Sequence, residues 1–128
     1  MTYDEFNAYC SALPATTYVV QWGGAHVWKV GGPEGGKVFA IGGWADGSDG
    51  GRPAYTFKTS PLTYEILKEQ PGLRPAPYLA SRGMKWIQHY AEPGLNDKDL
   101  KAYLKESHRL VSLGLSKKRQ RELGLNLE

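Results

Sequence analysis

The residue types that usually carry catalysis or bind metal are few and scattered in this sequence. The three histidines, His26, His89 and His108, each stand alone in their segments, without a second histidine two or four residues away. Ser48 lies in Gly-Ser-Asp-Gly, which is typical of a turn, and no Gly-x-Ser-x-Gly nucleophile elbow occurs. We therefore expect no catalytic residues, no metal site and no cofactor.

A glycine-rich segment from Gly31 to Lys37 ends in Gly-Lys, as phosphate-binding loops do. Such a loop also needs serine or threonine after the lysine, and a helix whose N-terminus faces the phosphate. Here Val38 follows and the residues continue in a strand pattern. The segment is better interpreted as a hairpin turn between two strands.

Positive charge is concentrated in the second half of the chain. Residues 1–59 carry four Lys/Arg and five Asp/Glu, whereas residues 60–128 carry twelve and eight. Between Ser107 and Arg121 there are five basic residues and no acidic one. A polyanion-binding protein needs this kind of asymmetry, although a solvated C-terminal helix shows it as well.

The spacing of the basic residues predicts how they are presented. A helix from Asp97 to about Leu113 would carry four of them on one face, opposite an apolar stripe: Lys98, Lys101, Lys105 and Arg109. A last short helix, capped by Ser116, would add Lys117, Lys118, Arg119 and Arg121. Strands that end near glycine turns would add Lys29, Lys37 and Lys58. These eleven residues are the predicted DNA-binding residues, and phosphate contacts of this kind give affinity without reading base sequence.

The elements that must position these residues follow from periodicity and caps. Thr2 and Glu5 form a capping box that begins a helix ending before Pro14. Alternation and glycine turns predict an antiparallel four-strand meander over residues 16–22, 25–30, 37–41 and 54–58. Ser60 would cap a helix over residues 62–70, followed by an ordered loop over 71–83 and a fifth strand over 84–90 in the same sheet. Trp28 and Trp86 lie among the alternating apolar residues, so both are expected to be buried.

Length and composition are those of one ordinary globular domain. The chain has 128 residues, of which 41% are hydrophobic, and its one cysteine, Cys10, is expected to be a buried apolar residue. The acidic N-terminus lacks the apolar run of a signal peptide, and no stretch approaches the length of a membrane span. We expect a cytoplasmic, monomeric protein that spans no membrane.

The order of motifs resembles the MmcQ/YjbR family of small bacterial proteins. The resemblance rests on the series Val27-Trp28-Lys29-Val30, Gly36-Lys37-Val38-Phe39-Ala40, Phe57-Lys58-Thr59-Ser60-Pro61, Ala76-Pro77-Tyr78-Leu79, Lys85-Trp86-Ile87, Ser107-His108-Arg109-Leu110-Val111 and Leu115-Ser116-Lys117-Lys118. It implies an α+β fold, in which a five-stranded antiparallel sheet packs with helices, and DNA binding through paired hairpin-loop wings.

Two features depart from the family pattern. His108 stands where the family often has tyrosine, and the loop from Gly42 to Pro53 is longer and richer in glycine than the resemblance implies. This loop carries Arg52 against Asp46 and Asp49, which makes it a poor binder of phosphate.

Three functions stay open on the sequence. The first is DNA binding with little base specificity, and its alternative is a protein-interaction or chaperone-like adaptor module using an exposed sheet face or the 71–83 loop. The third is an enzyme or ligand-binding protein with a pocket lined by Trp22, Trp28 and Trp86, for which core packing is the simpler interpretation.

Overall fold

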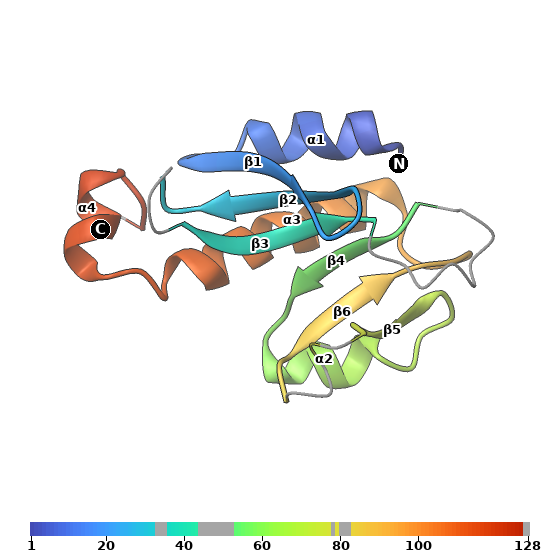
Figure 1. The fold of residues 1–128 in the computed structure, drawn as a ribbon. Coiled ribbons are helices and arrows are strands. Elements are labelled where there is room, and N and C mark those ends of the chain that lie inside the picture. The colour runs from blue at the N-terminus through green and yellow to red at the C-terminus, as the bar shows by residue number, and fades with distance from the viewer. Residues whose placement is uncertain (33–35, 44–52, 78, 80–82, 127–128) are drawn as a thin grey trace.

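Helices and strands follow one another in a mixed order in the computed structural model, which describes residues 1–32, 36–43, 53–77, 79 and 83–126 (Figure 1). In chain order the elements are α1 (Tyr3–Ser11), β1 (Thr16–Gln21), β2 (Ala25–Val30), β3 (Lys37–Gly42), β4 (Tyr55–Lys58), α2 (Pro61–Leu67), β5 (Leu73–Pro75), β6 (Trp86–His89), α3 (Asp97–Ser112) and α4 (Lys117–Glu122). No helix among these residues is long and apolar enough to cross a membrane.

The strands form one antiparallel sheet in the order β1-β2-β3-β4-β6-β5. The α+β class, the four-strand meander and a further strand within residues 84–90 are therefore confirmed. The predicted number of five strands is wrong. A sixth strand, β5, lies in the 71–83 segment that we expected to be a loop, and it pairs with β6. With only three residues, one of them Pro75, β5 is too short to show the alternation by which strands are recognised.

The predicted helix starts are confirmed by side-chain caps. Thr2 and Glu5 form the reciprocal capping box of α1, and the side chains of Ser60, Asn96 and Ser116 each accept a hydrogen bond from the backbone N–H three residues on. Each cap satisfies a donor that a helix N-terminus would otherwise leave unpaired. The end of α2 is less well predicted, because the helix stops at Leu67 and not at residue 70.

The hairpin between β1 and β2 differs from the expected two-residue turn. Gln21 pairs with Ala25, so three residues lie in the loop, and Trp22 adopts a φ of +50°. That backbone conformation takes Trp22 out of the strand, so the prediction that the first strand extends to residue 22 is wrong. The two glycines that follow, both at positive φ, let the chain reverse within this short loop.

The main core lies between the sheet and helices α1, α2 and α3. The inward stripe predicted for α3 comprises Leu100, Tyr103, Leu104, Ser107 and Val111. The structure buries all of these except Tyr103, which is partly buried against the core, and it buries His108 as well. The stripe packs on sheet residues that include Phe39 and Phe57, and we call this side of the sheet the helix-covered face. Cys10 is fully buried in the same core, and burial raises the pKa of its thiol to about 12, which fits the expected apolar role.

Trp28 and Trp86 are buried as predicted, with 6% and 5% of their surfaces exposed. Trp28 lies on the helix-covered face, where its indole N–H donates to Asn7 on α1 at 2.9 Å. Trp86 is next to Ile87, which belongs to the main core, so alternation directs Trp86 to the opposite face. These two tryptophans and the hairpin residue Trp22 therefore cannot line one common pocket.

Parts of three predicted segments lie outside the described residues. They are residues 33–35 of the glycine turn before β3, residues 44–52 of the loop before β4, and residues 78 and 80–82 of the segment before β6.

Candidate nucleic-acid interface

The outer surface of α3 carries the first group of predicted DNA-binding residues. Lys98, Lys101, Lys105 and Arg109 are all exposed. At 3.6 residues per turn they project roughly opposite the buried stripe of Leu100, and so away from the sheet. We call these four residues the α3 ridge. The structure thus confirms that the ridge is exposed and lies on one side of the helix.

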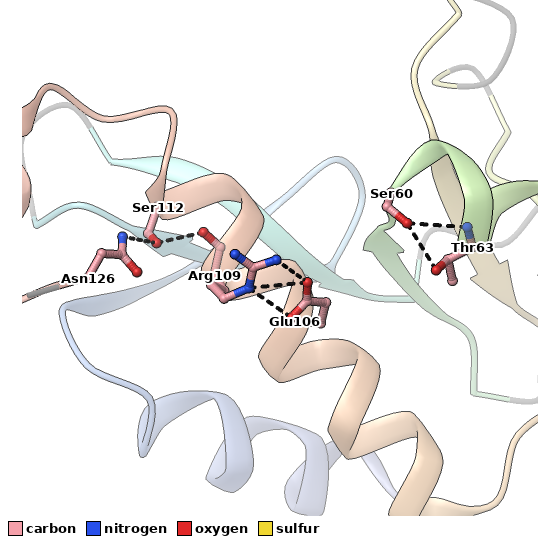
Figure 2. Close-up of polar contacts among 6 residues, drawn as sticks. All are labelled: Ser60, Thr63, Glu106, Arg109, Ser112 and Asn126. Carbon is pink, nitrogen blue, oxygen red and sulfur yellow. Dashed lines mark hydrogen bonds and ion pairs between the residues drawn. The ribbon is translucent and has the colours of Figure 1, made fainter. Parts of the chain in front are cut away.

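Local contacts reduce the free charge of the ridge unequally. Arg109 donates from Nε to Oε2 of Glu106 at 3.0 Å, one turn back on the same helix (Figure 2). This pairing lowers the pKa of the Glu106 carboxyl and raises the pKa of Arg109. The ammonium of Lys101 lies 5.8 Å from the ring centre of Tyr9 on α1. No contact of this kind involves Lys98 or Lys105 among the described residues, so their charges face solvent.

Helix α4 carries the second group of predicted residues. Lys117, Lys118 and Arg121 are exposed, and the first turn of the helix contains no acidic residue. Arg119 is different, because its Nε and Nη2 donate to the carbonyl oxygen of Gly31 at 3.2 and 3.0 Å. Arg119 therefore ties α4 to the end of β2, and only its three neighbours present charge freely.

The strand lysines occupy two different places. Lys37, at the start of β3, donates from Nζ to the carbonyl oxygen of Gly114 at 3.0 Å, which brings it to the turn between α3 and α4. Lys29 follows Trp28, and Lys58 follows Phe57, both of which face the helices. Since side chains alternate along a strand, Lys29 and Lys58 lie on the opposite face of the sheet.

The eleven predicted residues therefore do not form one surface. The structure brings Lys37 and Arg119 together with α4 at the end of the molecule where the chain turns from β2 to β3 (Figure 1). The α3 ridge leads along the helix toward that end. Lys29 and Lys58 would meet a different ligand surface, so we remove them from the candidate interface.

A close approach of backbone and side chain holds this end of the molecule in place. Gly32 has a φ of +90°, and a Cβ atom there would lie 2.6 Å from Nη2 of Arg119. The leucine that precedes α4, Leu115, packs against Gly31 at the same junction. The positive φ at Gly32 favours glycine, and a larger residue there would displace the guanidinium of Arg119.

A large cavity lies elsewhere on the molecule, and acidic side chains are prominent among its lining residues. It has a volume of about 840 Å³, and Glu92, Asp97 and Asp99 are among the residues that line it. His89 also lines it, and burial lowers the pKa of its imidazole by disfavouring the charged form. Sequence analysis did not single out this cavity, because its walls come from β4, β6 and the start of α3, which only the sheet pairing brings together.

The described residues contain no group of three or more histidine, cysteine, aspartate or glutamate side chains that could hold a metal ion. Burial also lowers the pKa of His108, whose Nε2 lies 2.8 Å from the carbonyl oxygen of Pro14. At this distance the imidazole donates to the carbonyl and holds α3 against the loop after α1. We therefore assign His108 a structural role.

The fold defines a small α+β protein with an antiparallel sheet, helices packed on one face and a cationic pair of C-terminal helices. A family model described as YjbR matches residues 11–110. Because the match spans more than half of the chain, this protein belongs to the YjbR family, also called MmcQ/YjbR.

Two solved structures share the fold. The Deinococcus radiodurans protein DR2400, described with a DUF419 domain, has a TM-score of 0.80 at 22% identity, covering 97% of this chain and 88% of that one. A protein from Pseudomonas syringae has a TM-score of 0.67 at 19% identity, covering 87% of this chain and 99% of that one. At these identities the likeness shows the fold alone. A search of curated proteins finds no match.

Proposed function

We propose that this protein is a non-catalytic DNA-binding protein that contacts the phosphate backbone of duplex DNA with little base specificity. The observation that supports the proposal is the exposed row of cations on α3 and α4. Lys98, Lys105, Lys117, Lys118 and Arg121 are exposed, and none of them has a carboxylate partner among the described residues. Each such cation can displace condensed counterions from a phosphate, and this release drives non-specific binding.

The contacts of the arginines favour phosphate binding over base reading. Arginine is the side chain that most often reads guanine, by donating two parallel hydrogen bonds to its edge in the major groove. Two of the three arginines in the interface already have partners: Arg109 binds Glu106, and Arg119 binds the carbonyl of Gly31. The remaining cations apart from Arg121 are lysines, which act as point charges and do not match the geometry of a base.

The described residues support DNA binding through hairpin wings, which the family resemblance implies, less than they support binding through α3 and α4. The turn between β1 and β2 consists of Trp22, Gly23 and Gly24, and none of them is basic. Residues 33–35, between β2 and β3, and residues 44–52, between β3 and β4, lie outside the described residues. We therefore assign the footprint to the two helices, with Lys37 and Arg119 holding α4 in position.

Salt titration of duplex binding tests the proposal. The slope of log affinity against log salt is about −0.9 for each phosphate contact. The double variant Lys117→Ala/Lys118→Ala should flatten the slope by up to about 1.8 if both ammonium groups contact phosphate. Affinity should fall by a similar factor on duplexes of unrelated sequence, because no base contact is removed.

The matched control is Lys29→Ala/Lys58→Ala, which removes the same charge from the opposite face of the sheet. This control should leave the slope unchanged. Equal flattening by both variants would show that only net charge matters and would contradict the proposed footprint. If the wild type shows no duplex binding at low salt, the proposed function itself is wrong.

A further inference from the structure

The two edges of the sheet are unequal. One edge is β5, which has three residues and ends at Pro75, and such short, proline-containing edges resist pairing with other chains. The other edge is β1, a strand of six residues, Thr16–Gln21, without proline or charge. Its register with β2 is uninterrupted, so no bulge twists it away from a partner. The β1 edge therefore lacks the features that protect an exposed strand.

Two large side chains beside this edge are exposed, although the hydroxyl of one of them, Tyr18, lies 2.7 Å from Nδ1 of His26 on β2. Tyr18 and Val20, on the helix-covered face of β1, have 45% and 54% of their surfaces accessible. They are uncovered because α1 lies over β2 and β3: Asn7 contacts His26 and Trp28 on β2, and the ring of Phe6 packs against Gly42 on β3. A shallow cavity of about 360 Å³ runs along this margin, with α1 as one wall and no second wall among its described lining residues.

The charge pattern of the sequence identifies the kind of partner. Residues 6–28, which supply most of α1, all of β1 and most of β2, contain no lysine, arginine, aspartate or glutamate. Over the whole chain, 23% of the residues are charged. An uncharged margin offers nothing to attract an acidic or basic partner, whereas two identical uncharged margins meet without like-charge repulsion.

In place of the monomer expected from the sequence, we propose that the β1 edge is a homodimer interface, in which β1 of two copies pairs in antiparallel fashion about a two-fold axis at Val19. In this register Tyr18 of each copy lies opposite Val20 of the other, an aromatic and β-branched pair of the kind that stabilises sheets. Thr17 lies opposite Gln21. The interface is isologous, since the same surface patch serves both copies.

The geometry of the paired sheets completes the half-formed cavity. Three strand spacings separate β2 of one copy from β2 of the other, which is about 14 Å. Each α1 lies over its own β2 and β3, so the two α1 helices become opposite walls of one trough. Packed helices approach to about 8–10 Å, and the larger spacing leaves room for Tyr18 and Val20 of both copies between them. The exposed apolar side chains are thereby buried.

Sedimentation equilibrium of the full chain over a wide concentration range tests the dimer. The wild type should reach twice the 14.2 kDa mass of one chain. The variant Tyr18→Lys/Val20→Lys places like charges opposite each other twice and should raise the dissociation constant of the dimer at least about a hundredfold. The matched variant Tyr18→Glu/Val20→Lys removes the same side chains but places opposite charges across the axis, so it should retain the dimer.

A second test, by disulfide cross-linking, avoids these charged substitutions. Val19→Cys places one thiol from each copy at the axis, within disulfide distance, so oxidation should give a covalent dimer. The control is Leu113→Cys, at an exposed position at the end of α3 and remote from β1, and oxidation of this variant should give no covalent dimer. These measurements need no DNA, so their outcome is separate from that of the proposed function.

Three outcomes would overturn the proposal. A wild type that stays monomeric throughout the range would exclude the dimer and leave the edge to an extended peptide from another protein. Retention of the dimer by both charged variants would place the interface elsewhere. Dissociation of both, with their circular dichroism spectra intact, would show that Tyr18 does not oppose Val20.

Discussion

Ser107 should be one of the most important polar side chains for stability, although it is a small residue on a helix. It is fully buried, and its hydroxyl donates to the carbonyl oxygen of Phe39 on β3 at 2.7 Å. The hydroxyl oxygen of Ser107 also accepts a hydrogen bond from the backbone N–H of Lys58 on β4 at 2.8 Å. Since the pairing of β3 with β4 ends at Ala40 and Phe57, Ser107 replaces the ladder hydrogen bond where the two strands diverge.

The substitution Ser107→Ala would leave one buried donor and one buried acceptor without this partner. Each unsatisfied buried group costs about 1–3 kcal/mol, so we expect a loss of about 2–6 kcal/mol in the free energy of unfolding. For a domain of this length that corresponds to a fall of roughly 7–22 °C in Tm. Urea denaturation should show a lower midpoint with an unchanged slope, because the folded state stays equally compact.

The control for this experiment is Ser11→Ala on α1. The Ser11 hydroxyl also donates to a backbone carbonyl, that of Ala8 at 2.8 Å, but both groups are exposed and water can replace the bond. The control should change stability by no more than about 0.5 kcal/mol. If Ser107→Ala is as mild as Ser11→Ala, the sheet does not depend on this helix hydroxyl and the reasoning is wrong.

Two further predictions concern the interface and the buried histidines. Arg119→Ala should lower the urea midpoint more than Arg121→Ala, because only Arg119 donates to Gly31 and holds α4 on the end of β2; equal effects would contradict this role. Stability should also fall as pH decreases below about 6.5, the ordinary histidine value, because burial lowers the pKa of both His89 and His108 and the unfolded chain then binds more protons. The difference in unfolding free energy between pH 7.5 and 5.5 should shrink in His108→Gln, and a pH dependence identical to that of the wild type would exclude a contribution from His108.

The elements with strong local signals could be predicted from the sequence. The side chains of Thr2, Ser60, Asn96 and Ser116 cap their helices as predicted, since capping depends on residues only three positions apart. The alternation of apolar residues placed the meander correctly, because a period of two is a property of the strand itself.

Features that depend on partners distant in the sequence could not be predicted in this way. Strand β5 exists because β6 offers it a free edge, and its three residues show no pattern of their own. Trp22 continued the alternation in sequence but left the strand, because the register of β1 with β2 requires a three-residue loop there. The extra residue of β3 opposite Trp28 and Lys29 is likewise visible only in the pairing.

In the candidate interface, too, some features follow from local spacing and others depend on tertiary packing. Helical spacing alone determined that Lys98, Lys101, Lys105 and Arg109 lie on one side of α3, because side-chain direction on a helix follows from position. Only the tertiary structure decided that Lys29 and Lys58 lie on the other face of the sheet, that Arg119 is held by Gly31, and that β1 is left as an exposed edge. Local spacing fixes the direction of a side chain within its own element, whereas its neighbours depend on how elements distant in sequence pack against each other.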